Sequence, residues 1–506
     1  MCHNVELLSA GKYKRGGLGV ALTPAEALLK VDFGHPDGTH DHNLNNYFYD
    51  RDVWSNIITR DKCFVIGRKG TGKSALCIWI KSQEKEKGIL VTNLKFQNFP
   101  FNRFLNLSDD EFARPNQYRS MWKYIILCEF AVQIYQDQSN DDDSSERREI
   151  DNFVETMFGR DTSELHTVIT EEAKKDGAKV VVKPFTLSAT RELKRAEIGE
   201  WNNIVQINER LESLLINIFQ RTNRQYLIQF DQLDDNYNLY RDNTKYFEAL
   251  ISLFKVIYDL NGEISRVSSQ AKVIAYLRSD IYAQFSRHDA DSAKFEYASY
   301  KLHWRERSGR NRDYYYPPLQ KLIDLRIRHS LPSGAGITFE NIFAPIHNTD
   351  PFRYMRHRTL HRPRDMIQLC VKVQKMTGEI GILSSETFAA AEKSYSLWLK
   401  DELINEVAPI VPETHLLFEM LKNAGKFFSH SEFNEMLNGS RYKQVHDSCE
   451  ELLRYLYELG IIVHWEISSP NERLRMYSAA QDPGSAYNPN LYCAVHPGLQ
   501  KGLYIN

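Results

Sequence analysis

The run from Gly67 to Ser74, Gly-Arg-Lys-Gly-Thr-Gly-Lys-Ser, constrains this 506-residue chain more than any other segment. It fits the pattern GxxxxGK[ST], follows an apolar stretch at 63–66 and opens an apolar run at 75–80. A strand, a glycine-rich loop and a helix in that order form a phosphate-binding loop, because successive backbone N–H groups and the helix N-terminus attract an anion. The sequence therefore predicts binding of a nucleoside polyphosphate.

Every position of this run has a predicted role at the phosphates. The residues expected to bind the nucleotide are Gly67, Arg68, Lys69, Gly70, Thr71, Gly72, Lys73 and Ser74. The glycines let the backbone approach phosphate oxygens without a Cβ clash. Lys73 is expected to reach the β- and γ-phosphates, and Ser74 to bind Mg²⁺. The chain has no NKxD-like strand end of the kind that recognises GTP, so ATP (with its product ADP) and Mg²⁺ are the predicted ligands.

Composition narrows the class of protein. The chain carries 64 Lys and Arg against 66 Asp and Glu, so no overall field favours a nucleic acid or a membrane. Its seven cysteines are scattered without a CxxC pair, which indicates neither a zinc site nor a disulfide framework. Neither a signal-peptide pattern nor a transmembrane-length apolar run is found. The sequence predicts a soluble, cytoplasmic protein without a membrane partner.

Apolar strand patterns at 63–66, 89–94, 226–230, 272–277 and 300–304 alternate with helical segments. This alternation predicts an α/β fold with a parallel sheet. Helices are expected at 119–135 and about 201–219, and a solvated acidic loop at 137–149. The predicted domains are an N-terminal arm at 1–42, a P-loop core at 43–315 with a helical insertion at about 100–222, a helical lid at 316–405 and a winged-helix domain at 406–506.

Acidic residues follow the strand at 226–230, where the second half of a nucleotide site belongs. Asp231 ends this strand and is expected to hold Mg²⁺ through water as a catalytic carboxylate. Asp234 or Asp235 is the candidate for the general base or for the group that positions water. The alternative is that the strand simply ends in an acidic turn.

Two arginine-containing segments could contact the phosphates. The strand at 272–277 ends in Leu-Arg-Ser-Asp, so Arg278 or Ser279 could read the γ-phosphate, or Arg278 could merely pair with Asp280 or Asp231. Residues 358–365 precede an expected helix in the predicted lid, and their arginines could contact the nucleotide from that domain. The wider segment 301–365 holds 13 Lys and Arg against 6 Asp and Glu. Phosphate sensing, an oligomer contact, nucleic-acid binding or a solvated face would all account for this excess.

The last hundred residues have the pattern of a winged helix. Helices are expected at 414–422, through 433–437 and at 442–459, followed by a hairpin at 461–467 and 473–477 and a strand at 491–495. Residues 441–458 hold three basic and four acidic side chains, which disfavours an approach to DNA phosphates. Packing on its own ATPase core or on a partner protein is the preferred interpretation.

These motifs in this order resemble the STAND/AAA+-type P-loop ATPases, and in particular the bacterial P-loop ATPases labelled FunZ-like, over residues 43–375. The resemblance implies a five-stranded core in the order 5-1-4-3-2, a helical lid and ATP-controlled switching of conformation or assembly. It also implies that Asp231 is the Walker-B acid, that Arg278 is a sensor-1-like group and that Arg364 is a sensor-2-like group.

One departure from that pattern bears on activity, because Gln232 follows Asp231 where AAA+ proteins have glutamate. We therefore expect a slow ATPase that acts as a switch and controls homo-oligomerisation or the docking of a separate effector or partner protein. The FunZ-like resemblance implies a bacterial defence or mobile-element system. The alternatives are an ATP-dependent DNA-binding protein of initiator or loader type, which leaves nucleic-acid binding open, and a scaffold that holds nucleotide without hydrolysis.

Overall fold

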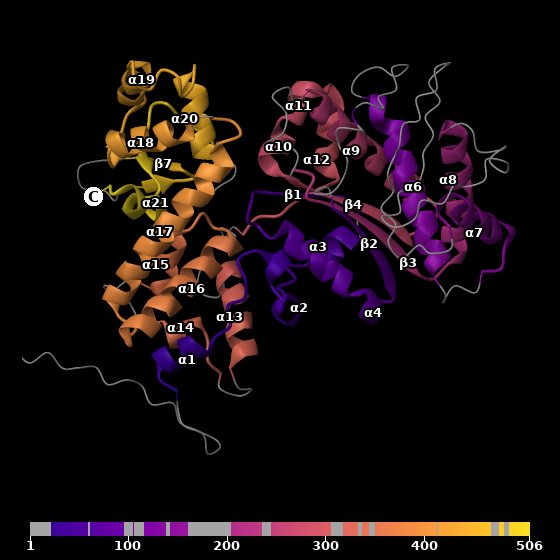
Figure 1. Cartoon of the computed structure of the whole chain (residues 1–506), viewed down its shortest axis with the longest axis horizontal. Helices are drawn as coiled ribbons and strands as arrows, with labels where there is room; N and C mark the ends of the chain where they lie inside the picture. The colour runs from indigo at the N-terminus through magenta and orange to yellow at the C-terminus, as the bar shows by residue number, and fades with distance from the viewer. Residues whose placement is uncertain are drawn as a thin grey trace, which may run out of the picture. The chain divides into compact units, whose positions relative to one another are not determined.

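The computed structural model divides the chain into two compact units, residues 37–304 and residues 1–36 with 305–506. We call the first the α/β unit and the second the helical unit (Figure 1). The structure describes residues 22–58, 61–95, 105, 116–137, 142–159, 204–234, 244–304, 317–331, 336–343, 350–411, 413–466, 475–479 and 485–505. Asp235 and the basic segment 305–316 lie outside these residues. Within the described part of the chain, no helix has the length and apolarity needed to cross a bilayer.

A parallel five-stranded sheet forms the centre of the α/β unit. Its strands are β1 (Phe64–Gly67), β2 (Ile89–Lys95), β3 (Gln225–Asp231), β4 (Ala271–Arg278) and β5 (Ser299–Lys301). They lie in the order β2-β3-β4-β1-β5 and pair in parallel throughout. This confirms the predicted fold class and the order 5-1-4-3-2. The fifth strand is shorter than expected, although the Leu302 amide still donates to the Ile66 carbonyl at 2.8 Å.

Helices cover both faces of this sheet. Those of the α/β unit are α2 (Leu44–Tyr47), α3 (Lys73–Ser82), α4 (Glu84–Lys87), α6 (Arg119–Gln136), α7 (Ser145–Phe158), α8 (Ile204–Arg221), α9 (Thr244–Ser265), α10 (Ser279–Ala283), α11 (Phe285–His288) and α12 (Lys294–Tyr297). The prediction of a solvated acidic loop at 137–149 is wrong for the second half of that segment. Helix α7 begins there, because the Ser144 hydroxyl accepts the Arg147 amide as an N-cap.

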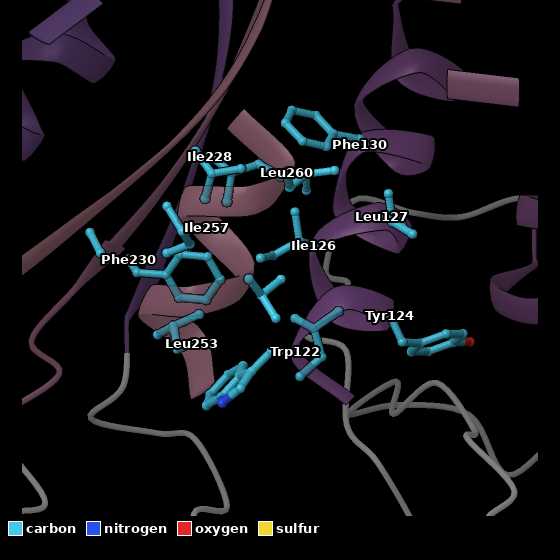
Figure 2. Packing of buried hydrophobic residues seen from close by; sticks show 14 of the residues in the cluster. Trp122, Tyr124, Ile126, Leu127, Phe130, Ile228, Phe230, Leu253, Ile257 and Leu260 are labelled. Atoms are coloured by element: carbon cyan, nitrogen blue, oxygen red, sulfur yellow. The ribbon is translucent and has the colours of Figure 1, made fainter. Parts of the chain in front are cut away.

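The larger core lies where α6 and α9 pack on one face of the sheet (Figure 2). The Trp122 ring meets the Phe230 ring edge-on at 6.2 Å, and the Trp122 indole donates to the Ala249 carbonyl at 2.8 Å. Helix α3 packs on the opposite face against alternate residues such as Leu227 and Tyr276. Side chains alternate along a strand, so Asp231 and Arg278 continue the series that faces α3.

The helical unit includes residues 316–405, and the role of these residues as a lid stays a prediction. The unit is built from α1 (Pro24–Lys30), α13 (Pro318–Ser330), α14 (Phe339–Ile342), α15 (Pro351–Arg358), α16 (Pro363–Ile380) and α17 (Ser385–Val407). Helix α1 falls in the segment expected to be a loose arm. Thr23 and Glu26 form a capping box at its start, and the Gln374 carboxamide donates to the Leu28 and Val31 carbonyls at 2.8 and 2.7 Å. These bonds hold the segment against α16.

The same unit ends in helices and a small antiparallel sheet. The elements are α18 (Thr414–Ala424), β6 (Phe427–Phe428), α19 (His430–Asn438), α20 (Cys449–Glu458), β7 (Ile462–Glu466), β8 (Arg475–Tyr477), β9 (Tyr492–Val495) and α21 (Pro497–Gln500). The strands lie in the order β6-β9-β7-β8. The third helix was expected from Tyr442, but it begins at Cys449 because Ser448 caps it by accepting the Glu451 amide. The winged-helix assignment stays a prediction.

Candidate nucleotide site

The glycine-rich loop joins β1 to α3 and has the backbone conformation that the motif requires. Gly70 and Gly72 have φ angles of +79° and +96°, in the left-handed region that favours glycine. A Cβ at Gly67 would lie 2.6 Å from the Thr71 hydroxyl and 3.0 Å from the Leu302 carbonyl oxygen. The loop is therefore closely packed against the chain that follows β5, and its first position has no room for a side chain.

Side chains of the loop are bonded to its own carbonyls. The Thr71 hydroxyl donates to the Arg68 carbonyl at 2.8 Å. The Lys73 ammonium donates to the Gly67 and Arg68 carbonyls at 3.0 and 3.2 Å. Burial lowers the pKa of Lys73, and the nearby charge of Asp234 opposes that shift. A phosphate at the loop would offer this buried ammonium a stronger, charged acceptor than the two carbonyls.

Asp231 lies at the end of β3 and is 4% exposed. The nearby Ser74 hydroxyl and the Gln232 backbone amide act to lower the pKa of this carboxyl group. Burial nevertheless raises the pKa of Asp231. The structure thus brings together the two residues predicted to hold Mg²⁺. Their oxygen donors fit that hard cation, whose charge would offset the burial of the carboxylate.

Gln232 is a site residue that the sequence indicated only as a departure from the family pattern. Its φ angle is +60°, an uncommon value for a residue other than glycine. Its side-chain oxygen is buried and has no hydrogen-bond partner within the described residues. A carboxamide can orient a water molecule through hydrogen bonds, but it cannot remove a proton from that water at neutral pH.

Arg278 is the neighbour of Gly67 in the β1–β4 ladder. Its guanidinium makes two hydrogen bonds to Asp280, at 3.0 and 2.5 Å, and lies 3.8 Å from a carboxylate oxygen of Asp234. Burial acts to raise the pKa of Asp280, but the charge and hydrogen bonds of Arg278 outweigh burial and lower it. The structure therefore brings Arg278 and Asp234 to the strand ends beside the loop.

Arg364 belongs to the first turn of α16 in the helical unit. Its guanidinium lies 3.3 Å from the Glu402 carboxylate, and both side chains are partly exposed. The sensor-2-like role of Arg364 stays a prediction, since it concerns a nucleotide bound by the other unit. Its neighbour Arg362 is buried and paired with Asp365 and Glu406 at 2.9 and 3.2 Å, so Arg362 is part of the core of the helical unit.

Sequence reasoning missed the part of the chain that packs around α3 ahead of β1. A Cβ at Gly38 would lie 2.6 Å from the Ala75 Cβ, which places residue 38 against the first turn of α3. The Phe48 ring stacks on the Trp79 ring with 4.5 Å between centroids. These contacts join residues well separated in sequence, and the aromatic residues at 47–49 were the only local signal for them.

The fold and the site define the class of protein: a P-loop ATPase-type α/β fold in which a parallel 5-1-4-3-2 sheet carries the phosphate loop after β1. Residues 317–404 match the FunZ-associated C-terminal helical domain. This match confirms, over those residues, the resemblance to FunZ-type proteins.

A curated relative matches over half of the chain. The chain is 25% identical over 286 residues to the transposon gamma-delta 80.3 kDa protein of Escherichia coli (strain K12). The match covers 54% of this chain and 37% of that protein, so this chain corresponds to little more than a third of its relative's length.

Two solved structures from Aeropyrum pernix are distantly similar. The ORC1 protein in complex with DNA is 12% identical with a TM-score of 0.33, over 96% of this chain and 92% of that one. The ORC2 protein, in ADPNP-ADP complexes, is 10% identical with a TM-score of 0.28, over 88% of this chain and 89% of that one. At these TM-scores neither likeness bears on the function of this chain.

Proposed function

We propose that this chain binds ATP with Mg²⁺ in its α/β unit, hydrolyses it slowly, and uses the bound nucleotide to control self-association or the docking of a partner protein. The observation that carries the proposal is the meeting of Lys73 and Ser74, at the start of α3, with Asp231 at the end of β3. Loop amides and Lys73 would bind the phosphates, and Ser74 with Asp231 would hold the metal. A bound Mg²⁺ would supply positive charge where negative charge develops during phosphoryl transfer.

Slow hydrolysis is supported by the groups that surround Asp231. The next residue is the neutral Gln232. The Asp234 carboxylate lies 3.8 Å from the Arg278 guanidinium, which engages it in an ion pair. Asp231 itself lies close to the Ser74 hydroxyl. A site that binds the phosphates closely, but whose carboxylates are engaged by neighbouring groups, suits a switch that stays in one nucleotide state for long periods.

A switch in a mobile-element or defence system is the setting we propose. The match to the FunZ-associated domain and the similarity to a transposon-encoded protein both support it. In this proposal the effector is a separate protein.

The DNA-loader alternative has less support. Of the basic residues at 301–365 that the structure describes, Arg358, Arg362 and Arg364 are paired with carboxylates of their own unit. Helix α20 has one arginine against three glutamates, which is unfavourable beside DNA phosphates. Binding to duplex DNA that weakens steeply with salt and requires Arg305, Arg307 or Arg310 would favour this alternative over the switch.

Two variants test the proposal directly. Lys73→Ala should weaken ATP binding by about 10- to 100-fold, because a buried, charge-assisted contact to phosphate is lost. Asp231→Asn should keep binding but lower turnover by about 100-fold. Binding is measured with a fluorescent ATP analogue, turnover by phosphate release, and assembly by size exclusion with ATP, with ADP and without nucleotide.

Lys87→Ala is the matched control, because it removes the same charge from an exposed position on α4 of the same unit. Unchanged nucleotide binding in Lys73→Ala would exclude this loop as the nucleotide site. Full turnover in Asp231→Asn would show that Asp231 is not the carboxylate that holds the metal. Assembly that is the same in all three nucleotide states would exclude control of self-association.

A further inference from the structure

The phosphate loop is bonded from outside the motif by a residue that follows β5. The Trp304 indole N–H donates to the Thr71 carbonyl oxygen at 2.8 Å, across 233 residues of sequence. Both residues are buried, with Trp304 8% and Thr71 5% exposed. Thr71 lies in the middle of the loop, between the two glycines with positive φ angles. The bond therefore acts on the part of the loop that would surround the phosphates.

This bond fixes the direction in which the Thr71 peptide points. A phosphate loop binds anions through its N–H groups, and a carbonyl turned toward the same anion would repel it. Trp304 holds the Thr71 carbonyl from the side of β5, while the Thr71 hydroxyl donates to the Arg68 carbonyl. The two bonds satisfy loop acceptors that would otherwise be free to turn toward the phosphates.

Trp304 is itself held by residues that precede β1. The Arg51 guanidinium carbon lies 5.0 Å from the centroid of the Trp304 ring, and Arg51 donates a hydrogen bond to the His303 carbonyl. The Tyr49 ring lies against the same indole, with 6.3 Å between centroids. Arg51 thus contacts both the ring and the backbone beside it, which restricts the position of the indole N–H.

We propose that Trp304 is a positioning residue for the phosphate loop, and that Arg51 acts on the loop through Trp304. This inference rests on the proposed binding of ATP at the loop. Trp304 is also the last residue of the α/β unit before the chain continues into the helical unit at Arg305. The hydrogen bond from Trp304 to Thr71 therefore joins the phosphate loop to the last residue of the α/β unit.

The test compares Trp304→Phe with Trp122→Phe in the full chain. Trp122 offers a matched control, because it too is a buried indole of the α/β unit that donates to a main-chain carbonyl at 2.8 Å. Trp304→Phe should raise the KM for ATP by about five-fold and leave kcat nearly unchanged, since a loop-shaping bond contributes to ground state and transition state alike. Trp122→Phe should leave KM unchanged even if it lowers the melting temperature as much.

Arg51→Ala provides a second variant in which the indole remains. It should raise KM by about two-fold, and the double variant with Trp304→Phe should be no worse than Trp304→Phe alone. If Trp304→Phe does not fold, the KM for ATP of Arg51→Ala decides whether the proposal holds. The proposal is overturned by an unchanged KM in both variants, by an equal rise in Trp122→Phe, or by a loss confined to kcat. Lys73→Ala separates the two claims: if it loses ATP while Trp304→Phe does not, only the role of Trp304 is wrong.

Discussion

Arg278 in the α/β unit and Arg362 in the helical unit each contact two carboxylates, but the two clusters differ in burial. Arg362, Asp365 and Glu406 have side chains that are 2%, 0% and 3% exposed. The side chains of Arg278, Asp280 and Asp234 are 12%, 23% and 21% exposed, and the contact of Arg278 with Asp234 is long at 3.8 Å. Each charged group of the first cluster depends on its ionic partners, because water cannot reach the buried cluster to take the place of a lost partner.

The second cluster can rearrange at a smaller cost. Water reaches both carboxylates, so Arg278 can exchange the long contact with Asp234 for a phosphate oxygen without leaving a buried charge unpaired. The same residue types thus form a structural cluster in one unit and an adaptable cluster beside the phosphate loop in the other. Burial, rather than residue type, separates the two roles.

The largest effect is expected at the buried cluster. Arg362→Met should lower the free energy of unfolding by about 3–5 kcal/mol, because it leaves Asp365 and Glu406 buried without their cation. Thermal and denaturant unfolding measure this loss. Arg364→Met is the matched control two residues away, where a partly exposed pair with Glu402 should contribute less than about 1 kcal/mol. Equal losses in the two variants would contradict the assignment of Arg362 to the core.

At the adaptable cluster, Arg278→Ala should lower ATP turnover by roughly 10- to 100-fold with a small effect on stability. Phosphate release and thermal unfolding measure the two effects. A large loss of stability with unchanged turnover would make Arg278 a structural residue like Arg362.

The pH dependence of stability gives a further check on Arg278. The pKa of Asp280 is lowered in the folded protein, so its stabilising contribution is present above the ordinary aspartate pKa. That contribution is lost as the pH falls through the lowered value. The difference in melting temperature between wild type and Arg278→Ala should therefore shrink at acidic pH.

The smallest effect is expected beside Asp231. Gln232→Glu should raise turnover by about 10-fold, because it adds a carboxylate that can accept a proton from water. The turnover rate of the variant should rise as the pH passes through the pKa of the introduced carboxyl group. The wild-type turnover rate should show no such rise. Phosphate release between pH 5 and 8 measures this. A decrease in turnover would mean that the carboxamide, with its N–H donors, positions water better than a base does.

Much of the fold could be predicted because its signals are local. The phosphate loop, the apolar strands and α6 follow from spacing and periodicity within short windows. Two errors had local signals that were available in the sequence. Thr23 and Glu26 form the capping box that starts α1, and Ser448 and Glu451 have the same spacing at the start of α20. Strand β6 has only two residues, too few for any periodic pattern.

Less of the site could be predicted, because its contacts join distant parts of the chain. The motif at 67–74 and the strand end at Asp231 were readable one by one, as was the departure at Gln232. No local pattern marks Trp304 as the partner of Thr71 or Arg51 as the partner of Trp304. The arginines at 278, 362 and 364 look alike in sequence, and only their surroundings separate them.

The sequence by itself determined the α/β class, the phosphate loop and the carboxylate at the end of β3, since each depends on residues adjacent along the chain. Only the tertiary structure decided which arginine is buried, which carboxylates Arg278 contacts and which residue outside the motif donates a hydrogen bond to the phosphate loop. The physical reason is that burial and hydrogen-bond partners depend on where distant segments pack, and the order of residues does not specify that packing locally.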